Sequence, residues 1–93
     1  MKMHYTYILL CIDYVRGYQE WYIGSTEDLQ KRLRRHKSKN VETTKKFDMV
    51  QLVYYEACLN KMDARKRELQ LKTGFGRGYV KRRLENYLKA GVV

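Results

Sequence analysis

The pattern of apolar and polar positions along the chain predicts three strands. Residues 5–12 and 50–55 are short runs of β-branched, aromatic and other apolar residues, which is typical of buried strands. A polar turn over residues 13–20 separates the first run from residues 21–23, which read as a returning strand ended by Gly24. The first two strands are therefore expected to form a hairpin.

The same pattern predicts a helix directly after this hairpin. Residues 25–28 (Ser-Thr-Glu-Asp) match a capping box, which satisfies the free amides at a helix start. Leu29 and Leu33 are four residues apart and so share one helical face. We expect this helix to run to about Lys37, and the polar residues 38–48 to form a loop.

Two further helices are predicted after the third strand. Asn60, with Asp63 three residues later, is a typical helix start, and Gly74 is a typical helix end. Residues 76–78 (Gly-Arg-Gly) then read as a turn, although a turn of this kind could also present its amides to a phosphate. The final helix should direct four apolar side chains inward: Val80, Leu84, Tyr87 and Leu88. The order ββαβαα indicates a small α/β (α+β) fold in which helices cover the sheet.

Length and composition indicate one small domain over residues 1–93. No window is apolar enough to span a membrane, and the first residues lack the pattern of a signal peptide. We therefore expect an intracellular protein, in the cytoplasm or nucleoid, with no membrane partner. Cys11 and Cys58 are expected to be free thiols, because that compartment is reducing. With two distant histidines they give no zinc-binding spacing.

The net charge of +10 changes the picture, because it is large for a domain of this size. Residues 31–39 form a basic run without an acidic residue. Such a surface indicates a polyanionic partner, first of all nucleic acid, although ribosomal binding, membrane-surface binding and simple solubility are alternatives. The candidate DNA contacts are Lys31, Arg34, Arg35, Lys37, Lys39, Arg65, Lys72 and Arg77.

Five side chains are candidates for chemistry at a phosphodiester. Tyr7 and Tyr22 stand on the two strands of the predicted hairpin, Arg32 and His36 share one face of the first helix, and Glu68 lies within the second. A carboxylate can hold a divalent cation, an arginine can stabilise a charged transition state, and a histidine or phenol can carry protons. Each residue taken alone also suits packing or a solvated surface. The residues by themselves therefore indicate a nucleic-acid-binding domain, without deciding whether it is an enzyme.

The spacing of these residues resembles the signature of the GIY-YIG nuclease family. Tyr22-Ile23-Gly24 matches the second half of the signature literally, whereas Tyr5-Thr6-Tyr7 keeps only the tyrosine of the first half. Arg32, His36 and Glu68 stand at the positions of the family's catalytic arginine, its frequent histidine and its metal-binding glutamate. Residues 52–56, 64–68 and 71–72 also resemble the small stand-alone branch, which is similar to the N-terminal domain of UvrC.

The resemblance implies the GIY-YIG fold, a three-stranded antiparallel sheet flanked by helices. It also implies a hydrolase, an endonuclease that cuts DNA with one Mg²⁺ or Mn²⁺ ion. In that family pattern Glu68 ligates the metal and Arg32 binds the scissile phosphate. Tyr7 or Tyr22 acts as the base or positions the water, with help from His36, and Gly24 belongs to the structural motif.

Three functions stay open on the sequence alone. The first is an endonuclease directed to the structure or damage of DNA, as in DNA repair. The second is a catalytically inactive module that binds nucleic acid, which the complete set of site residues argues against. The third is an adaptor nuclease subunit that is active only in a complex, with a partner protein that supplies specificity. RNA is the alternative substrate class, and the oligomeric state and the pathway are not indicated.

Overall fold

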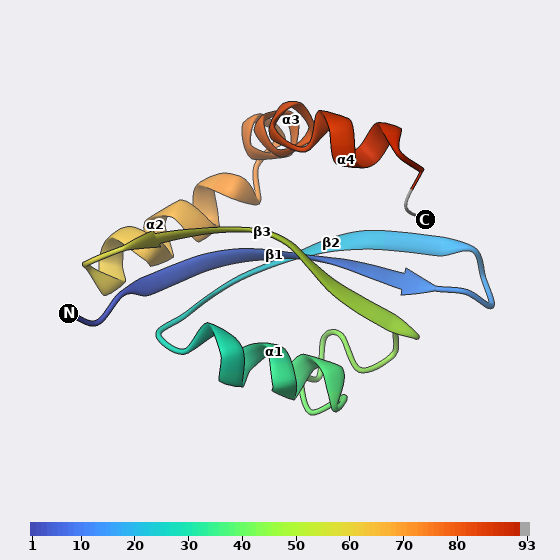
Figure 1. Cartoon of the computed structure of the whole chain (residues 1–93), viewed down its shortest axis with the longest axis horizontal. Helices are drawn as coiled ribbons and strands as arrows, with labels where there is room; N and C mark the ends of the chain where they lie inside the picture. The colour runs from blue at the N-terminus through green and yellow to red at the C-terminus, as the bar shows by residue number, and fades with distance from the viewer. Residues whose placement is uncertain (92–93) are drawn as a thin grey trace.

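The computed structural model describes residues 1–91 and builds them around a three-stranded antiparallel sheet (Figure 1). The strands are β1 (His4–Asp13), β2 (Tyr18–Thr26) and β3 (Met49–Cys58), in the spatial order β2-β1-β3. β1 is therefore the central strand, and β2 and β3 are the two edges. The predicted α+β class and antiparallel sheet are confirmed.

The second strand is longer than its apolar run predicts. β2 pairs with β1 from Thr26, opposite Tyr5, to Tyr18, opposite Asp13. The connecting turn therefore shrinks to residues 14–17. Backbone hydrogen bonds to the central strand extend the pairing through polar positions, which apolar patterning cannot detect.

Side chains of β1 alternate between two apolar clusters, one on each face of the sheet. Tyr7, Leu9 and Cys11 point to one face, where Leu29 and Leu33 of α1 (Leu29–Lys37) pack against them. The other face is covered by the later helices, and Figure 1 shows α1 below the sheet and α2–α4 above it. Each face of the molecule can therefore carry its own set of functional side chains.

The later helices are α2 (Lys61–Leu71), α3 (Gly74–Arg83) and α4 (Glu85–Lys89). Asn60 caps α2 as predicted, because its side-chain oxygen accepts hydrogen bonds from the first backbone amides of the helix. No helix within residues 1–91 is both long enough and apolar enough to cross a membrane. Both cysteines are free, as expected, with Cys11 buried and Cys58 half-buried.

The predicted capping box at residues 25–28 is wrong. Asp28 caps α1 by accepting a hydrogen bond of 3.0 Å from the backbone N–H of Lys31. Ser25 and Thr26 instead continue β2 and stay paired with β1. The side chain of Ser25 is thereby available for a different contact, described below.

The predicted turn at residues 76–78 is also wrong. Gly74 begins α3 instead of ending α2, and Thr73 caps the new helix by accepting from the backbone N–H of Gly76. A β-carbon at Gly76 would lie 2.3 Å from the carbonyl oxygen of Leu71, so the glycine allows α3 to start tightly against the end of α2. Because these amides are bonded inside the helix start, the turn cannot present them to a phosphate.

The predicted final helix is divided at Leu84, where α3 ends and the short α4 begins. Val80 is buried as expected, and Leu84 and Tyr87 are half-buried. Leu88 is exposed although it faces the sheet side of α4, because it lines a hollow that stays open over Leu10 and Trp21.

Candidate active site

Four of the predicted site residues meet on the α1 face of the sheet. Tyr7 comes from β1 and Tyr22 from β2, while Arg32 and His36 come from one side of α1. The Tyr22 ring lies edge-on to the His36 ring, with centroids 4.9 Å apart, and 6.1 Å from the ring of Tyr7. Residues far apart in the sequence are therefore gathered in one cluster.

Hydrogen bonds join three of these groups in a chain. Arg32 donates from Nε to the Tyr7 hydroxyl at 3.1 Å, and that hydroxyl lies 2.9 Å from Nε2 of His36. At the other side of the imidazole, Nδ1 lies 2.8 Å from Oγ1 of Thr44. The Arg32 guanidinium uses one N–H for Tyr7, so its terminal nitrogens are further donors for a bound anion.

Burial sets the protonation states of these hydrogen-bonded groups. It lowers the pKa of His36 to about 4, with the cationic Arg32 and Arg35 adding to the effect. His36 is therefore neutral near pH 7, and one of its ring nitrogens is an acceptor. Burial also raises the pKa of Tyr7 to about 12, against the opposing hydrogen bond from Arg32. A protonated Tyr7 that donates to Nε2, with Nδ1–H donating to Thr44, satisfies every group.

Gly24 explains how the Tyr7 hydroxyl reaches this position. Gly24 is paired with Tyr7 across the hairpin and is buried. A β-carbon at Gly24 would lie 2.7 Å from the Tyr7 hydroxyl oxygen and 2.8 Å from the ring carbon that bears it. The phenol therefore lies directly over the bare backbone of β2, where any side chain would displace it.

Glu68 lies on the opposite face of the sheet from these four residues. Its carboxylate is 5 % exposed and accepts from the Ser25 hydroxyl at 2.7 Å and from Lys72 at 2.7 Å, with Arg65 at 3.3 Å. Ser25 and Gly24 are neighbours on the edge strand β2, so their side-chain positions point to opposite faces. The edge strand β2 thus lies between the carboxylate and the Tyr7 and Arg32 groups.

Comparison with known proteins assigns this chain to a family. The family model described as the GIY-YIG catalytic domain matches residues 3–83. This chain belongs to the GIY-YIG family. A UPF0213 protein of Bacillus pumilus is 39% identical over 71 residues, which cover 75% of this chain and 67% of that protein. A UPF0213 protein of Staphylococcus saprophyticus is 38% identical over 74 residues, or 78% of this chain and 84% of that protein. No solved structure gives a significant match.

Membership of the GIY-YIG family indicates a nuclease with a nucleic-acid substrate, and members generally depend on a divalent metal. Within residues 1–91 no group of three or more His, Cys, Asp or Glu side chains is placed to hold an ion. A lone carboxylate still fits Mg²⁺, which commonly takes its remaining ligands from substrate phosphates and water. Burial tends to raise the pKa of Glu68, but hydrogen bonds from Lys72 and Ser25 outweigh it, and the pKa is lowered. Glu68 is therefore ionised near neutral pH, as an oxygen ligand of a divalent ion has to be.

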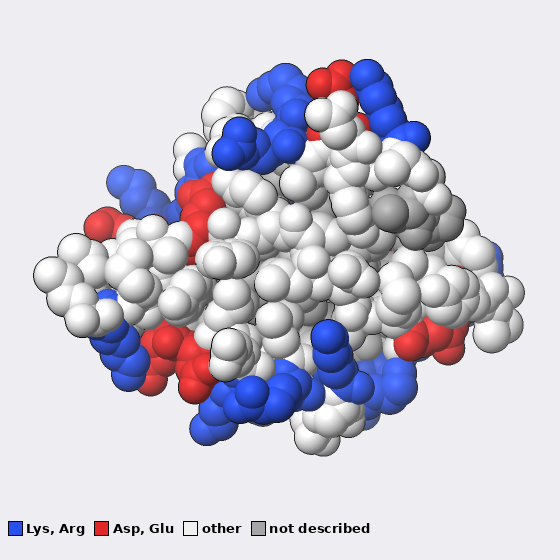
Figure 2. Space-filling model, viewed as in Figure 1, with Lys and Arg blue, Asp and Glu red and all other residues white. Residues whose placement is uncertain are grey.

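The predicted DNA contacts of this GIY-YIG domain fall into two groups, one on each side of the sheet. Figure 2 shows basic side chains along the α1 side and along the α3–α4 side, with a largely uncharged band between them. Exposed residues of α1 and the following loop supply the first group: Lys31, Arg34, Arg35, Lys37 and Lys39. Arg65 and Lys72 lie beside Glu68 on α2, and Arg77 lies on α3. Lys39 is partly engaged already, since its Nζ donates to the Phe47 carbonyl at 2.6 Å.

Two polar residues of the site were missed by sequence reasoning. Ser25 was assigned to a helix cap, and it holds Glu68 instead. Thr44 was assigned to a polar loop, but it is 1 % exposed and bonds His36. Their partners lie 43 and 8 residues away in the sequence, so no local pattern indicates either contact.

Proposed function

We propose that this GIY-YIG domain is an endonuclease that hydrolyses phosphodiester bonds in DNA with the help of one Mg²⁺ or Mn²⁺ ion. The single observation that carries the proposal is the chain of hydrogen bonds from Arg32 through Tyr7 to a neutral His36. It combines a phosphate-binding cation and a proton acceptor in one cluster. A module that only binds the DNA backbone needs exposed cations alone, so a cation joined to a proton acceptor favours catalysis over simple binding.

Arg32 is the group that holds the scissile phosphate in this proposal. Its Nε is fixed by the Tyr7 hydroxyl, which directs the planar guanidinium and leaves paired donors for two phosphate oxygens. Charge that develops on those oxygens in the transition state is then met by donors already in place. Tyr7 is fully buried, so it does not hold the phosphate itself; its hydroxyl orients Arg32 and connects the site to His36.

Tyr22 is the phenol that meets the attacking water, because it is half-buried and Tyr7 is fully buried. A proton released at the site can pass to the Tyr7 oxygen while the Tyr7 proton moves to Nε2 of His36, 2.9 Å away. Part of the low basicity of His36 comes from the charge of Arg32. A phosphate bound to Arg32 offsets that charge and makes His36 a better acceptor.

Glu68 is the residue that would hold the metal ion, with Ser25 orienting its carboxylate. When bound, the ion would polarise the phosphate and neutralise charge on the reacting oxygens. Lys72 and Arg65 now contact the same carboxylate, so they must move aside for the ion and are then available to the DNA backbone. Cleavage directed to branched or damaged DNA, with or without a partner protein that supplies specificity, is part of the proposal.

The test compares Glu68→Gln with Glu56→Gln. Both glutamates accept hydrogen bonds from basic residues of α2, but Glu56 pairs with Arg67 beside the other edge strand and is no site residue. Labelled single-stranded, duplex, flap and junction DNA is incubated with each protein, with and without Mn²⁺. We expect Glu68→Gln to lose at least about 100-fold in Mn²⁺-dependent rate, the scale of a lost transition-state contact, and Glu56→Gln to cut normally.

DNA binding measured in Ca²⁺ distinguishes a wrong assignment of Glu68 from a protein that binds DNA without cutting it. If Glu68→Gln cuts like the wild type, Glu68 is not the metal ligand and the assignment is wrong. If the wild type binds every substrate and cuts none, with Mn²⁺ present, the chain is a binding module or requires a partner protein for activity. The expected result is DNA binding by all three proteins and cleavage by two.

A further inference from the structure

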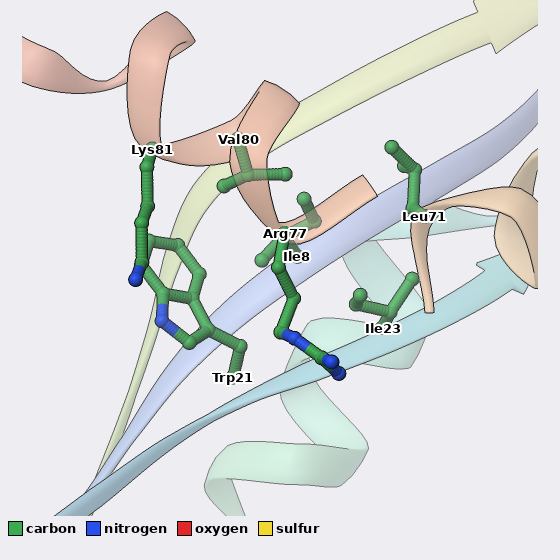
Figure 3. A pocket seen from close by; sticks show the side chains of 7 residues that line it. All are labelled: Ile8, Trp21, Ile23, Leu71, Arg77, Val80 and Lys81. Carbon is green, nitrogen blue, oxygen red and sulfur yellow. The ribbon is translucent and has the colours of Figure 1, made fainter. Parts of the chain in front are cut away.

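An apolar hollow lies between β2 and α3, on the face of the sheet opposite Arg32 and His36 (Figure 3). It measures about 40 Å³. The apolar side chains that line it include Ile8 and Ile23 of the sheet, Leu71 of α2 and Val80 of α3. Trp21 stands at one side as a wall of the hollow. Arg77 and Lys81 extend from α3 over the opening, so a cationic rim surrounds an apolar floor.

A larger hollow of about 500 Å³ adjoins the first and shares Trp21 and Lys81 with it. It lies beneath α4, where that short helix covers the sheet incompletely, and Leu10, Gln19 and Lys89 contribute to its lining. The indole therefore stands between two depressions of one continuous groove. The larger one matches the volume of typical small-molecule sites, which are roughly 300–1,000 Å³.

The charges along this groove favour an anionic occupant. The seven residues that line the smaller hollow include two cations and no acidic residue. Arg77 and Lys81 are one helical turn apart, and within residues 1–91 neither forms an ion pair. Glu85 is the one acidic residue of the larger hollow, and Lys89 neutralises it at 3.0 Å. An occupant with a flat apolar body and negative groups at its margin satisfies both the indole and the cations.

We propose that this groove is a subsite for an unpaired nucleotide of the DNA substrate, whose base stacks on Trp21 while its phosphates contact Arg77 and Lys81. Aromatic stacking combined with cations is the usual way in which proteins hold single-stranded DNA. A base inside a duplex already stacks on both neighbours, so it cannot offer a face to Trp21 without leaving the stack. The inference rests on the proposed nuclease function and narrows its substrate to DNA with a single-stranded part.

The position of Trp21 connects this subsite to the candidate active site. Trp21 and Tyr22 are consecutive on β2, so their side chains point to opposite faces of the sheet. β2 is an edge strand, and a flexible DNA strand can pass around that edge. A strand cut on the Tyr22 face therefore continues naturally onto the Trp21 face, a path too sharply bent for a duplex.

Intrinsic fluorescence tests the subsite directly, because Trp21 is the one tryptophan of the chain. The full chain is titrated in Ca²⁺ with a single-stranded thymine oligonucleotide, an abasic strand of equal length and a blunt duplex. We expect the thymine strand to quench the fluorescence saturably, and the abasic strand and the duplex to bind without comparable quenching. Equal quenching by the abasic strand would overturn the proposal, because that strand carries the same phosphates and no bases.

Two variants test whether Arg77 contacts the bound strand or only adds to the overall positive charge of the protein. Arg77→Gln is compared with Arg82→Gln, which removes an exposed arginine of the same helix that does not line the groove. We expect Arg77→Gln to weaken the single-strand titration and to lower its salt slope by about 0.7, and Arg82→Gln to leave both unchanged. Equal effects of the two substitutions would show that Arg77 makes no specific contact with the phosphates of the bound strand.

Cleavage assays distinguish failure of this subsite from failure of the nuclease proposal. Trp21→Phe preserves packing and should weaken single-strand binding less than Trp21→Ala, for which a loss of about tenfold is expected. Cleavage in Mn²⁺ without any fluorescence response to single strands would refute the subsite and leave the nuclease intact. A fluorescence response without cleavage would support the subsite and count against nuclease activity of this chain alone. Fluorescence that changes with protein concentration alone would identify the groove as a contact between copies of the chain, and would also overturn the proposal.

Discussion

His36 gives the sharpest prediction, because its neutral state is required both for the fold and for the proton uptake proposed above. In the unfolded chain a histidine takes up a proton as the pH falls through about 6.5, whereas folded His36 resists until about 4. Between these values the unfolded state binds more protons, so the free energy of unfolding falls as the pH falls. The gap corresponds to a loss of about 3 kcal/mol as an upper bound, fully present as stability above pH 6.5.

The assay is urea unfolding of the wild type and of His36→Gln at several pH values across this window. The wild type should lose stability steadily from pH 6.5 toward 4, whereas His36→Gln starts lower and declines much less. The lowered pKa of Glu68 places its own loss of stability below pH 4.5, at the acid end of this window, and the wild type and His36→Gln share that loss. His4→Gln, which replaces the other histidine, serves as the control and should behave like the wild type.

The same protonation state predicts the pH dependence of cleavage. If His36 is the proton acceptor, kcat/KM of the folded enzyme should decline as the pH approaches about 4, and not near 6.5, because kcat/KM reports the free enzyme. A parallel stability decline in wild type and His36→Gln would refute the buried neutral histidine. A cleavage profile that breaks near pH 6.5 would show that a different group takes the proton.

Arg32, Gly24 and the basic surface each give one further prediction. Arg32→Lys should slow single-turnover cleavage by about 100-fold or more, because a lysine cannot hold Tyr7 and fork onto a phosphate together, whereas exposed Arg35→Lys should be close to neutral. Gly24→Ala should cost about 1–3 kcal/mol in urea unfolding, since its β-carbon would lie 2.7 Å from the Tyr7 hydroxyl, whereas Gly78→Ala should be neutral or stabilising. Duplex binding should weaken with salt at a slope of roughly −4 to −5 if about five phosphates are neutralised, and a slope near zero would exclude a nucleic-acid footprint.

The parts of the site that could be predicted from the sequence are those set by local periodicity. Arg32 and His36 share a face because they are four residues apart in a helix, and this held in the structure. Tyr7 and Tyr22 meet because the hairpin pairs Tyr7 with Gly24, which places both tyrosines on one face. Family spacing added Glu68 to the set, although no periodicity connects it to the others.

The rest depended on contacts between distant segments. Ser25 has a good capping sequence, but pairing with β1 stabilises it as strand, and only the packing of α2 brings Glu68 to its hydroxyl. Thr44 sits in a loop whose polar sequence indicates solvent, yet the loop folds back over His36. The prediction of a turn at Gly76 was wrong as well, because this glycine allows α3 to pack closely against the end of α2. In each case a tertiary contact outweighed a local propensity.

The edge strand β2 is what joins these observations. Its consecutive residues face opposite sides of the sheet, so Tyr22 and the bare Gly24 belong to the side of Arg32, and Trp21 and Ser25 belong to the side of Glu68. In the middle of a sheet the two sets could never act on one substrate, because neighbouring strands would stand between them. At an edge, a single DNA strand can reach both by passing around β2. The position of β2 in the sheet therefore explains how groups on two faces can form one site, and why a flexible, unpaired strand suits that site better than a stiff duplex.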